Sequence, residues 1–244
     1  FFDLLPPVIS IDSPASGSRI NLPIVTYATN EELGEGNITF TRTGGTQDPD
    51  SPHVVNLSGQ RLKQGTRYDE TFESDLQLKD GSVYSISFGA QDMAGNIATD
   101  VSIQNITFDS SAPQLSITSP LSPTFTNDLM VEYSTNENLS KGVIFVERTG
   151  GPNDSSSPHE VELVDGQLIK SSKISLNLSQ QLNLVSNAVY RIYIEGLDVA
   201  GNEGKSDMVE SITFDNVPPE ISITSPAVES FINAPVLGLK ANET

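Results

Sequence analysis

The residues of this chain best suited to chemistry are oxygen-bearing side chains that recur at a fixed spacing. Asp92 and Asn96 bracket the sequence Met-Ala-Gly, and Asp198 and Asn202 bracket Val-Ala-Gly 106 residues further along. Carboxylate and amide oxygens are the ligands that Ca²⁺ prefers, usually in sets of about six to eight. The same spacing also suits a plain hairpin turn, in which Asp caps the turn and Gly or Asn adopts a positive φ. Both interpretations are open for these residues.

More oxygen ligands follow the same period. The sequence Phe-Asp-x-x-x-Pro begins at positions 2, 108 and 214, and Asn-Glu begins at positions 30, 136 and 242. These aspartates also suit the capping of a linker, and Asn-Glu also suits a solvated loop. The residues predicted as Ca²⁺ ligands are Asp3, Glu31, Asp92, Asn96, Asp109, Glu137, Asp198, Asn202, Asp215 and Glu243.

Other catalytic and binding chemistry has little support in the sequence. The chain has no cysteine, which excludes disulfides, thiol nucleophiles and zinc–thiolate sites. Its only histidines, His53 and His159, are one period apart, and one histidine per repeat cannot build a zinc site. Thr43-Gly44-Gly45 lacks the lysine of a phosphate-binding loop. We therefore expect no enzymatic activity, and the segment from Thr43 to His53 has no predicted role.

Composition narrows the class of protein further. The net charge of -19 disfavours nucleic acid and anionic membrane surfaces as partners. Hydrophobic residues make up 36% of the 244 residues, which is enough for packed cores. No run approaches the ~18 apolar residues of a membrane span, so we expect no membrane insertion.

The fixed spacing reveals a tandem duplication. Thr43-Gly44-Gly45 returns at 149–151 and Ser51-Pro52-His53 returns at 157–159. The predicted organisation is therefore the end of a preceding repeat or linker at 1–5, two full repeats at 6–111 (repeat 1) and 112–217 (repeat 2), and the start of a truncated third repeat at 218–244. We expect the chain to be a window on a longer array.

Each repeat is predicted to be all-β, because apolar residues alternate with a period of two. The predicted inward positions of repeat 1 are, strand by strand, Ile9 and Ile11 (A); Val25, Tyr27 and Thr29 (B); Ile38 and Phe40 (C); Val55 and Leu57 (D); Tyr68 and Phe72 (E); Tyr84, Ile86, Phe88 and Ala90 (F); and a last strand from Ile97 to Phe108 (G). Seven strands in about 100 residues are typical of an immunoglobulin-like Greek-key sandwich. Tyr84 and Tyr190 each suit a tyrosine corner, with the hydroxyl bonded back to the loop before strand F.

The pattern Ile-Thr-Phe-Asp-x-x-x-Pro followed by Ile-Ser-Ile-Thr-Ser-Pro, with Asp-x-Ala-Gly-Asn before the last strand, resembles the tandem bacterial Ig-like domains of large secreted and cell-surface proteins, including adhesin-type arrays. The resemblance covers both repeats and the 218–244 fragment. It implies an extracellular or cell-surface location and neighbouring Ig-like repeats as partners. It also implies junction ions of the kind such arrays often carry.

In an Ig-like topology the B–C loop, the F–G turn and the incoming linker lie at one end of the sandwich. Asp109, Glu137 and Asp198 are therefore expected to meet at the junction between the repeats. The C–D loop of the preceding repeat, with Asp48 and Asp50, and its E–F loop, with Asp75 and Asp80, are expected to face them. A cation there would offset the repulsion and stiffen the joint.

The leading functional interpretation is a spacer or stalk in a long extracellular repeat protein, stiffened by Ca²⁺ at the junctions. One alternative is self-assembly of identical chains into a filament, sheath or surface layer. Another is a glycan- or protein-binding module. Against that third interpretation, the chain has no Trp, at least four of its six Tyr are predicted to be buried, and we expect no exposed aromatic platform.

Overall fold

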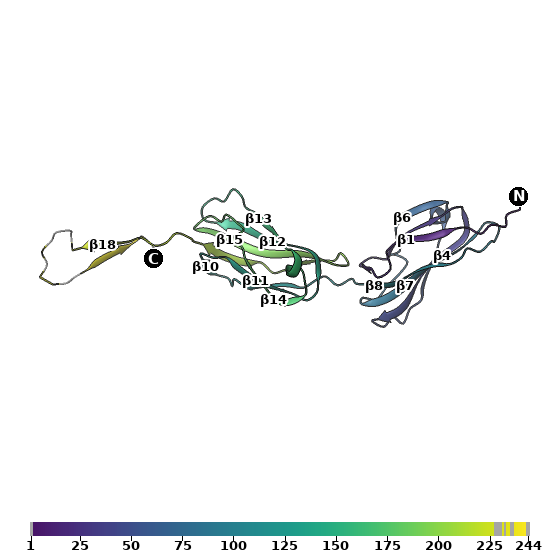
Figure 1. Ribbon diagram of the computed structural model, residues 1–244, viewed down its shortest axis with the longest axis horizontal. Coiled ribbons are helices and arrows are strands. Elements are labelled where there is room, and N and C mark those ends of the chain that lie inside the picture. Colours follow the sequence, from purple (N-terminus) through teal and green to yellow (C-terminus); the bar gives the residue numbers. More distant parts are fainter. Residues whose placement is uncertain (1, 227–230, 232, 235–236, 243–244) are drawn as a thin grey trace.

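The computed structural model describes residues 2–226, 231, 233–234 and 237–242. It contains two β-sandwiches one after the other, followed by a hairpin of β18 (Ile221–Ser225) and β19 (Gly238–Ala241) (Figure 1). Both sandwiches contain two sheets, as expected for the Ig-like class, so the predicted fold class is confirmed. Among the described residues, the helical content is limited to two short 3₁₀ turns, Gly59–Leu62 and Asp165–Gln167.

Repeat 1 pairs a three-stranded sheet with a five-stranded one. The first has the order β1 (Ile9–Ser13), β3 (Ile24–Thr29), β6 (Gly65–Thr71). The second has the order β2 (Arg19–Ile20), β8 (Val101–Phe108), β7 (Ser82–Asp92), β4 (Leu33–Gly45), β5 (His53–Asn56). β2 pairs with β8 in parallel and the other neighbours are antiparallel.

Repeat 2 repeats this plan with one additional short strand. Its smaller sheet has the order β14 (Ser171–Asn177), β11 (Met130–Thr135), β9 (Leu115–Ser119). Its larger sheet has the order β10 (Thr124–Thr126), β17 (Val209–Phe214), β15 (Ala188–Asp198), β12 (Leu139–Gly150), β13 (His159–Glu162), with β16 (Glu203–Lys205) also paired to β15.

The alternation of apolar residues positions the core between the sheets. In β7 and β15 every second residue is buried along all eleven positions. Tyr27, Tyr84, Tyr133 and Tyr190 are fully buried, as predicted. Phe72 is also buried, whereas the side chain of Tyr68 lies outside the described part of the chain. Burial of such large side chains contributes roughly 1.5–3 kcal/mol each to folding.

One sequence-based strand boundary needs correction, and two features of the strands go beyond the prediction. The fourth strand, β5, pairs with β4 and so belongs to the larger sheet. The predicted first strand is β1, and β2 follows it as a separate short strand, because Pro14 lacks the N–H needed to continue the first ladder and the chain crosses to the other sheet. The last strand begins at Val101 rather than Ile97, which forms only an isolated bridge with Gln91 and is 73% exposed.

Candidate metal centre at the repeat junction

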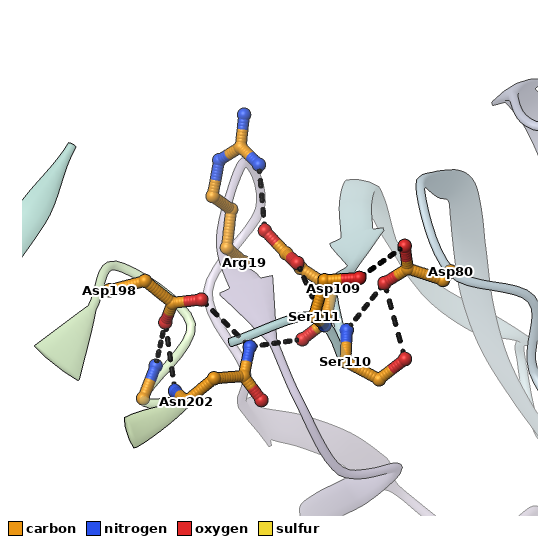
Figure 2. Close-up of polar contacts among 8 residues, drawn as sticks. Arg19, Asp80, Asp109, Ser110, Ser111, Asp198 and Asn202 are labelled. Carbon is orange, nitrogen blue, oxygen red and sulfur yellow. Dashed lines mark hydrogen bonds and ion pairs between the residues drawn. The ribbon is translucent and has the colours of Figure 1, made fainter. Parts of the chain in front are cut away.

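The linker between the repeats lies against the F–G turn of repeat 2. The amide nitrogen of Asn202 donates to the Asp109 carbonyl oxygen at 2.8 Å and to Asp198 Oδ2 at 2.7 Å (Figure 2). Asn96 makes the equivalent bonds to the Asp3 carbonyl at 3.2 Å and to Asp92 Oδ2 at 2.7 Å. Both turns are thus tied to the segment that enters their repeat.

Two groups of three carboxylates form at these contacts. In the junction cluster, defined as Asp109, Glu137 and Asp198, one carboxylate oxygen of each residue lies within 4.8 Å of the others. The same holds for the N-terminal cluster, defined as Asp3, Glu31 and Asp92. The structure therefore brings together six of the ten predicted ligands, three from each group.

The turn aspartates also cap their turns. Asp198 Oδ1 accepts from the backbone N–H groups of Gly201 at 2.6 Å and Asn202 at 2.8 Å. Asp92 Oδ1 accepts from Ala94 at 2.7 Å and Asn96 at 2.9 Å. The turn interpretation of these aspartates is therefore supported by direct hydrogen bonds. It does not compete with a ligand role, because the same side chains also reach the clusters.

The junction cluster concentrates negative charge. Burial raises the pKa of Glu137, and the charges of Asp109 and Asp198 raise it further. Arg19 offsets part of this charge, since its Nη1 lies 3.2 Å from Asp109 Oδ2 (Figure 2). The donor set fits a hard divalent cation, because it offers three anionic oxygen ligands from three separate segments.

Of the other four predicted ligands, the three that the structure describes contribute no carboxylate oxygen to either cluster. The Asn96 and Asn202 side chains face the clusters through their amide nitrogens, as given above. Asp215 Oδ1 accepts from Ser186 Oγ at 2.8 Å and from the Val217 N–H at 3.1 Å, at the end of repeat 2. Glu243 lies outside the described residues.

Of the four acids predicted to face the cluster from repeat 1, Asp80 is the one that holds the linker. Its carboxylate accepts from Ser110 N at 2.6 Å, Ser110 Oγ at 3.2 Å and Ser111 Oγ at 2.9 Å (Figure 2). The hydrogen bond from the Ser110 N–H is the main reason that the pKa of Asp80 is lowered. Asp75 instead pairs with Arg61 at 3.2 Å.

A cavity of about 260 Å³ adjoins the cluster between the two repeats. Its lining comprises Arg19 and Asp109 from repeat 1 and Glu137, Asn138, Lys170 and Val199 from repeat 2. The junction is therefore polar and hollow, with room for water or an ion beside the carboxylates.

Asp48 has a different role from the predicted one, because it is buried inside repeat 1. Its Oδ2 accepts from the Tyr84 hydroxyl at 2.5 Å and lies 2.7 Å from His53 Nε2. The Tyr84 hydroxyl in turn accepts from the Lys79 N–H at 3.0 Å, which confirms the tyrosine corner. Asp50 is exposed, and its N–H donates to Asp48 Oδ1 at 3.2 Å.

Repeat 2 contains the same buried network. Asp154 Oδ2 accepts from the Tyr190 hydroxyl at 2.7 Å and lies 2.7 Å from His159 Nε2. Burial would raise the pKa of each aspartate, but hydrogen bonds from its Tyr and His outweigh burial and hold the pKa below the ordinary value. The segment from Thr43 to His53, which had no predicted role, thus carries the Asp and His that fasten the C–D loop to the E–F corner.

The glycines of this segment are needed for close packing. Gly45 has φ +68°, and a Cβ there would lie 2.1 Å from the Gly81 carbonyl oxygen. Gly151 is equivalent in repeat 2, with φ +72° and 2.3 Å to the Asn187 carbonyl oxygen. The sequence signal for the network was the joint recurrence of Thr-Gly-Gly, Asp, Ser-Pro-His and the corner tyrosine.

No protein-family model matches the sequence, and no curated protein matches it. Among solved structures, the FN1–FN3 domains of chicken CNTN1 are similar with 13% identity and a TM-score of 0.42, covering 83% of this chain and 67% of that one. The fibronectin(III)-like modules of CbhA from Clostridium thermocellum show 14% identity and a TM-score of 0.38, covering 85% and 94%. Domains of titin show 10% identity and a TM-score of 0.39, covering 85% and 67%. Within the described residues, no helix has the length and apolar character needed to cross a membrane.

Proposed function

We propose that the chain is a non-enzymatic structural segment of a long extracellular repeat protein of the adhesin type. Its Ig-like sandwiches act as a spacer, and Ca²⁺ bound at the junctions limits bending between them. The observation that carries the proposal is the junction cluster, in which carboxylates from the linker, the B–C loop and the F–G turn come within 4.8 Å of one another.

The stiffening follows from where the three carboxylates originate. Asp109 belongs to the linker, whereas Glu137 lies in the loop between β11 and β12 and Asp198 is the last residue of β15, where the F–G turn begins. A cation bound by all three ties the linker to both loops, and Asp80 ties the same linker to repeat 1. Without a cation, the carboxylates repel one another: burial is the main cause of the raised pKa of Glu137, and the charges of Asp109 and Asp198 raise it further. Extracellular modules bind Ca²⁺ at roughly 10⁻⁴–10⁻³ M, so the site would be mostly occupied where Ca²⁺ exceeds that range and would empty on chelation.

The test is small-angle X-ray scattering of the full chain during a Ca²⁺ titration. We expect the ensemble to become more extended and less variable with Ca²⁺, and chelation to reverse the change. Glu137→Gln should remove most of the response, while Glu162→Gln, a matched change at an exposed position on β13, should keep it. Scattering that is identical with Ca²⁺ and with chelator would refute the stiffening.

A further inference from the structure

The outer face of the larger sheet in repeat 2 carries a pair of stacked aromatic rings. Phe145 on β12 and Tyr193 on β15 are partners in register, with ring centroids 4.8 Å apart and planes inclined by 12°. Both rings are partly exposed, because they alternate with the core residues Ile144, Val146 and Ile192. The expectation of no exposed aromatic platform is therefore wrong for this face.

One end of the stack already holds a cation. The Lys205 ammonium lies 4.0 Å from the centroid of the Tyr193 ring and 2.7 Å from Glu195 Oε1. An ammonium held between an aromatic face and a carboxylate is a cation–π arrangement with a bound counter-charge. The contact of Lys205 with Tyr193 and Glu195 thus shows that this face stabilises a cationic group.

The other end of the stack also combines an aromatic face with a carboxylate. Since Tyr193 covers one face of Phe145, the opposite face is turned toward β13, where Glu160 is its partner in register. Among the described residues, no Lys or Arg forms an ion pair with Glu160. An aromatic face beside a carboxylate is therefore available to a cation from outside the chain.

A hollow of about 520 Å³ lies on this face, within the size range of ligand sites. Val143, Phe145 and Leu197 provide its apolar part. Its charged lining has three carboxylates, Glu160, Glu195 and Glu203, against the two lysines Lys141 and Lys205. Because Lys205 is already paired with Glu195 and the chain carries a net charge of -19, the surface is complementary to a cationic partner.

Repeat 1 lacks this arrangement. The residues one period before Phe145, Tyr193 and Lys205 are Thr39, Ser87 and Thr99. The hollow on the same face of repeat 1 is smaller, about 250 Å³, and has no aromatic lining. The aromatic stack is thus a property of repeat 2 and is not required by the fold.

We propose that this face of repeat 2 binds an arginine side chain presented by an extended basic segment of another protein. Guanidinium is the best match, because it is planar, stacks on an aromatic ring and pairs with a carboxylate through two N–H groups. β13 is at the edge of its sheet, so an extended segment can approach Glu160 and Phe145 from the side. This binding role is independent of the Ca²⁺ clusters.

The test is fluorescence anisotropy of the full chain with a labelled peptide of four Arg-Gly repeats. Replacing the stack with the repeat 1 residues, Phe145→Thr together with Tyr193→Ser, leaves the net charge unchanged. We expect affinity to fall about tenfold in this variant, in line with the ~0.5–2 kcal/mol of a cation–π contact. Glu160→Gln should weaken binding as well, and a Lys-Gly peptide of the same length should bind less tightly.

The thermal midpoint of each variant shows whether repeat 2 still folds. The reverse change, Thr39→Phe and Ser87→Tyr together with Val54→Glu at the position equivalent to Glu160, should add affinity in repeat 1. Equal binding of the Arg-Gly peptide by the parent chain and the Phe145→Thr/Tyr193→Ser variant would overturn the proposal, because binding would then reflect net charge alone. A neutral oligosaccharide such as cellohexaose that binds through the stack, while the peptide does not, would overturn it in favour of a glycan.

Discussion

Repeat 1 and repeat 2 build the same buried network and the same group of three carboxylates from residues one period apart, but their outer sheet faces carry different side chains. Asp48 and Asp154 are both buried beside a His and a Tyr. In contrast, Thr39 and Ser87 in repeat 1 correspond to the stacked Phe145 and Tyr193 in repeat 2. Features present in both repeats belong to folding and linkage, whereas a feature of one repeat is a candidate for binding a partner.

The largest expected effect tests whether the buried network serves both repeats equally. Asp48→Ala and Asp154→Ala each leave a buried Tyr hydroxyl and a His without their acceptor. We expect each to destabilise its own repeat by about 3 kcal/mol, because a buried hydrogen-bonding group left without its partner costs about 1–3 kcal/mol. Urea denaturation measures the loss. Asp50→Ala, an exposed neighbour in the same loop, should cost less than about 0.5 kcal/mol.

If the losses of stability caused by Asp48→Ala and Asp154→Ala differ several fold, the network has separate roles in the two repeats. An Asp48→Ala variant as stable as Asp50→Ala would show that the network contributes nothing measurable.

The second prediction uses pH, because the network and the junction cluster respond with opposite signs. The folded pKa of Asp48 and Asp154 lies below the ordinary Asp value, so their stabilisation is present above about pH 4 and is lost as the pH falls through the folded pKa. The folded pKa of Glu137 is raised above the ordinary Glu value, so its contribution favours the folded junction below about pH 4.3 and is lost as the pH rises through the folded pKa.

With a chelator present, acidification from pH 7 to pH 4 should therefore tighten the junction while the sandwiches remain folded, and further acidification should unfold them. Denaturation curves report the sandwiches, and energy transfer between dyes placed on the two repeats reports the junction. Glu137→Gln should flatten the junction response alone. A junction that loosens steadily on acidification would contradict the assigned repulsion.

The sequence was sufficient to predict the strands whose alternation reaches the core. In β7 and β15 each second residue is apolar and buried, so period two identified both strands and the corner tyrosines. It could not assign β5 to a sheet, because Val55 is buried at the same alternation whichever neighbour pairs with its strand.

The site residues, like the strands, could not be predicted from the sequence where tertiary contacts decide their positions. Asp109, Glu137 and Asp198 could be expected to meet because a known topology orders the loops at each end of the sandwich. Asp48 was expected to face the junction, since a loop aspartate is ordinarily solvated, and only the tertiary contacts with His53 and Tyr84 bury it. Phe145 was overlooked although Ile144-Phe145-Val146 places apolar residues on both faces of one strand.

The third prediction compares the two carboxylate clusters. Arg19 pairs with Asp109 of the junction cluster, whereas no arginine or lysine pairs with Asp3, Glu31 or Asp92 among the described residues. Arg19→Gln removes a competing positive charge, and we expect Ca²⁺ affinity at the junction to rise by up to about fivefold, the equivalent of ~1 kcal/mol for an exposed ion pair. Calorimetric titration with Ca²⁺ measures both sites, and Glu137→Gln identifies the junction signal. A uniform change at both clusters would contradict a local effect of Arg19.

The smallest expected effect distinguishes the two linkers. Position 80 in repeat 1 corresponds to Ser186 in repeat 2, so Asp80→Ser gives the first linker the residue that contacts the second. The change removes a carboxylate that accepts from Ser110 and Ser111, yet it leaves the cores untouched, so the cost to folding should stay below about 1 kcal/mol.

The expected result of Asp80→Ser is wider motion between the repeats without Ca²⁺, measured as a broader distance distribution between spin labels on the two sandwiches. Bound Ca²⁺ should narrow the distribution only in part, because the linker would keep its Arg19 contact with repeat 1 but lose those of Asp80. An unchanged distribution would mean that the junction cluster, Asn202 and Arg19 hold the linker without help from Asp80.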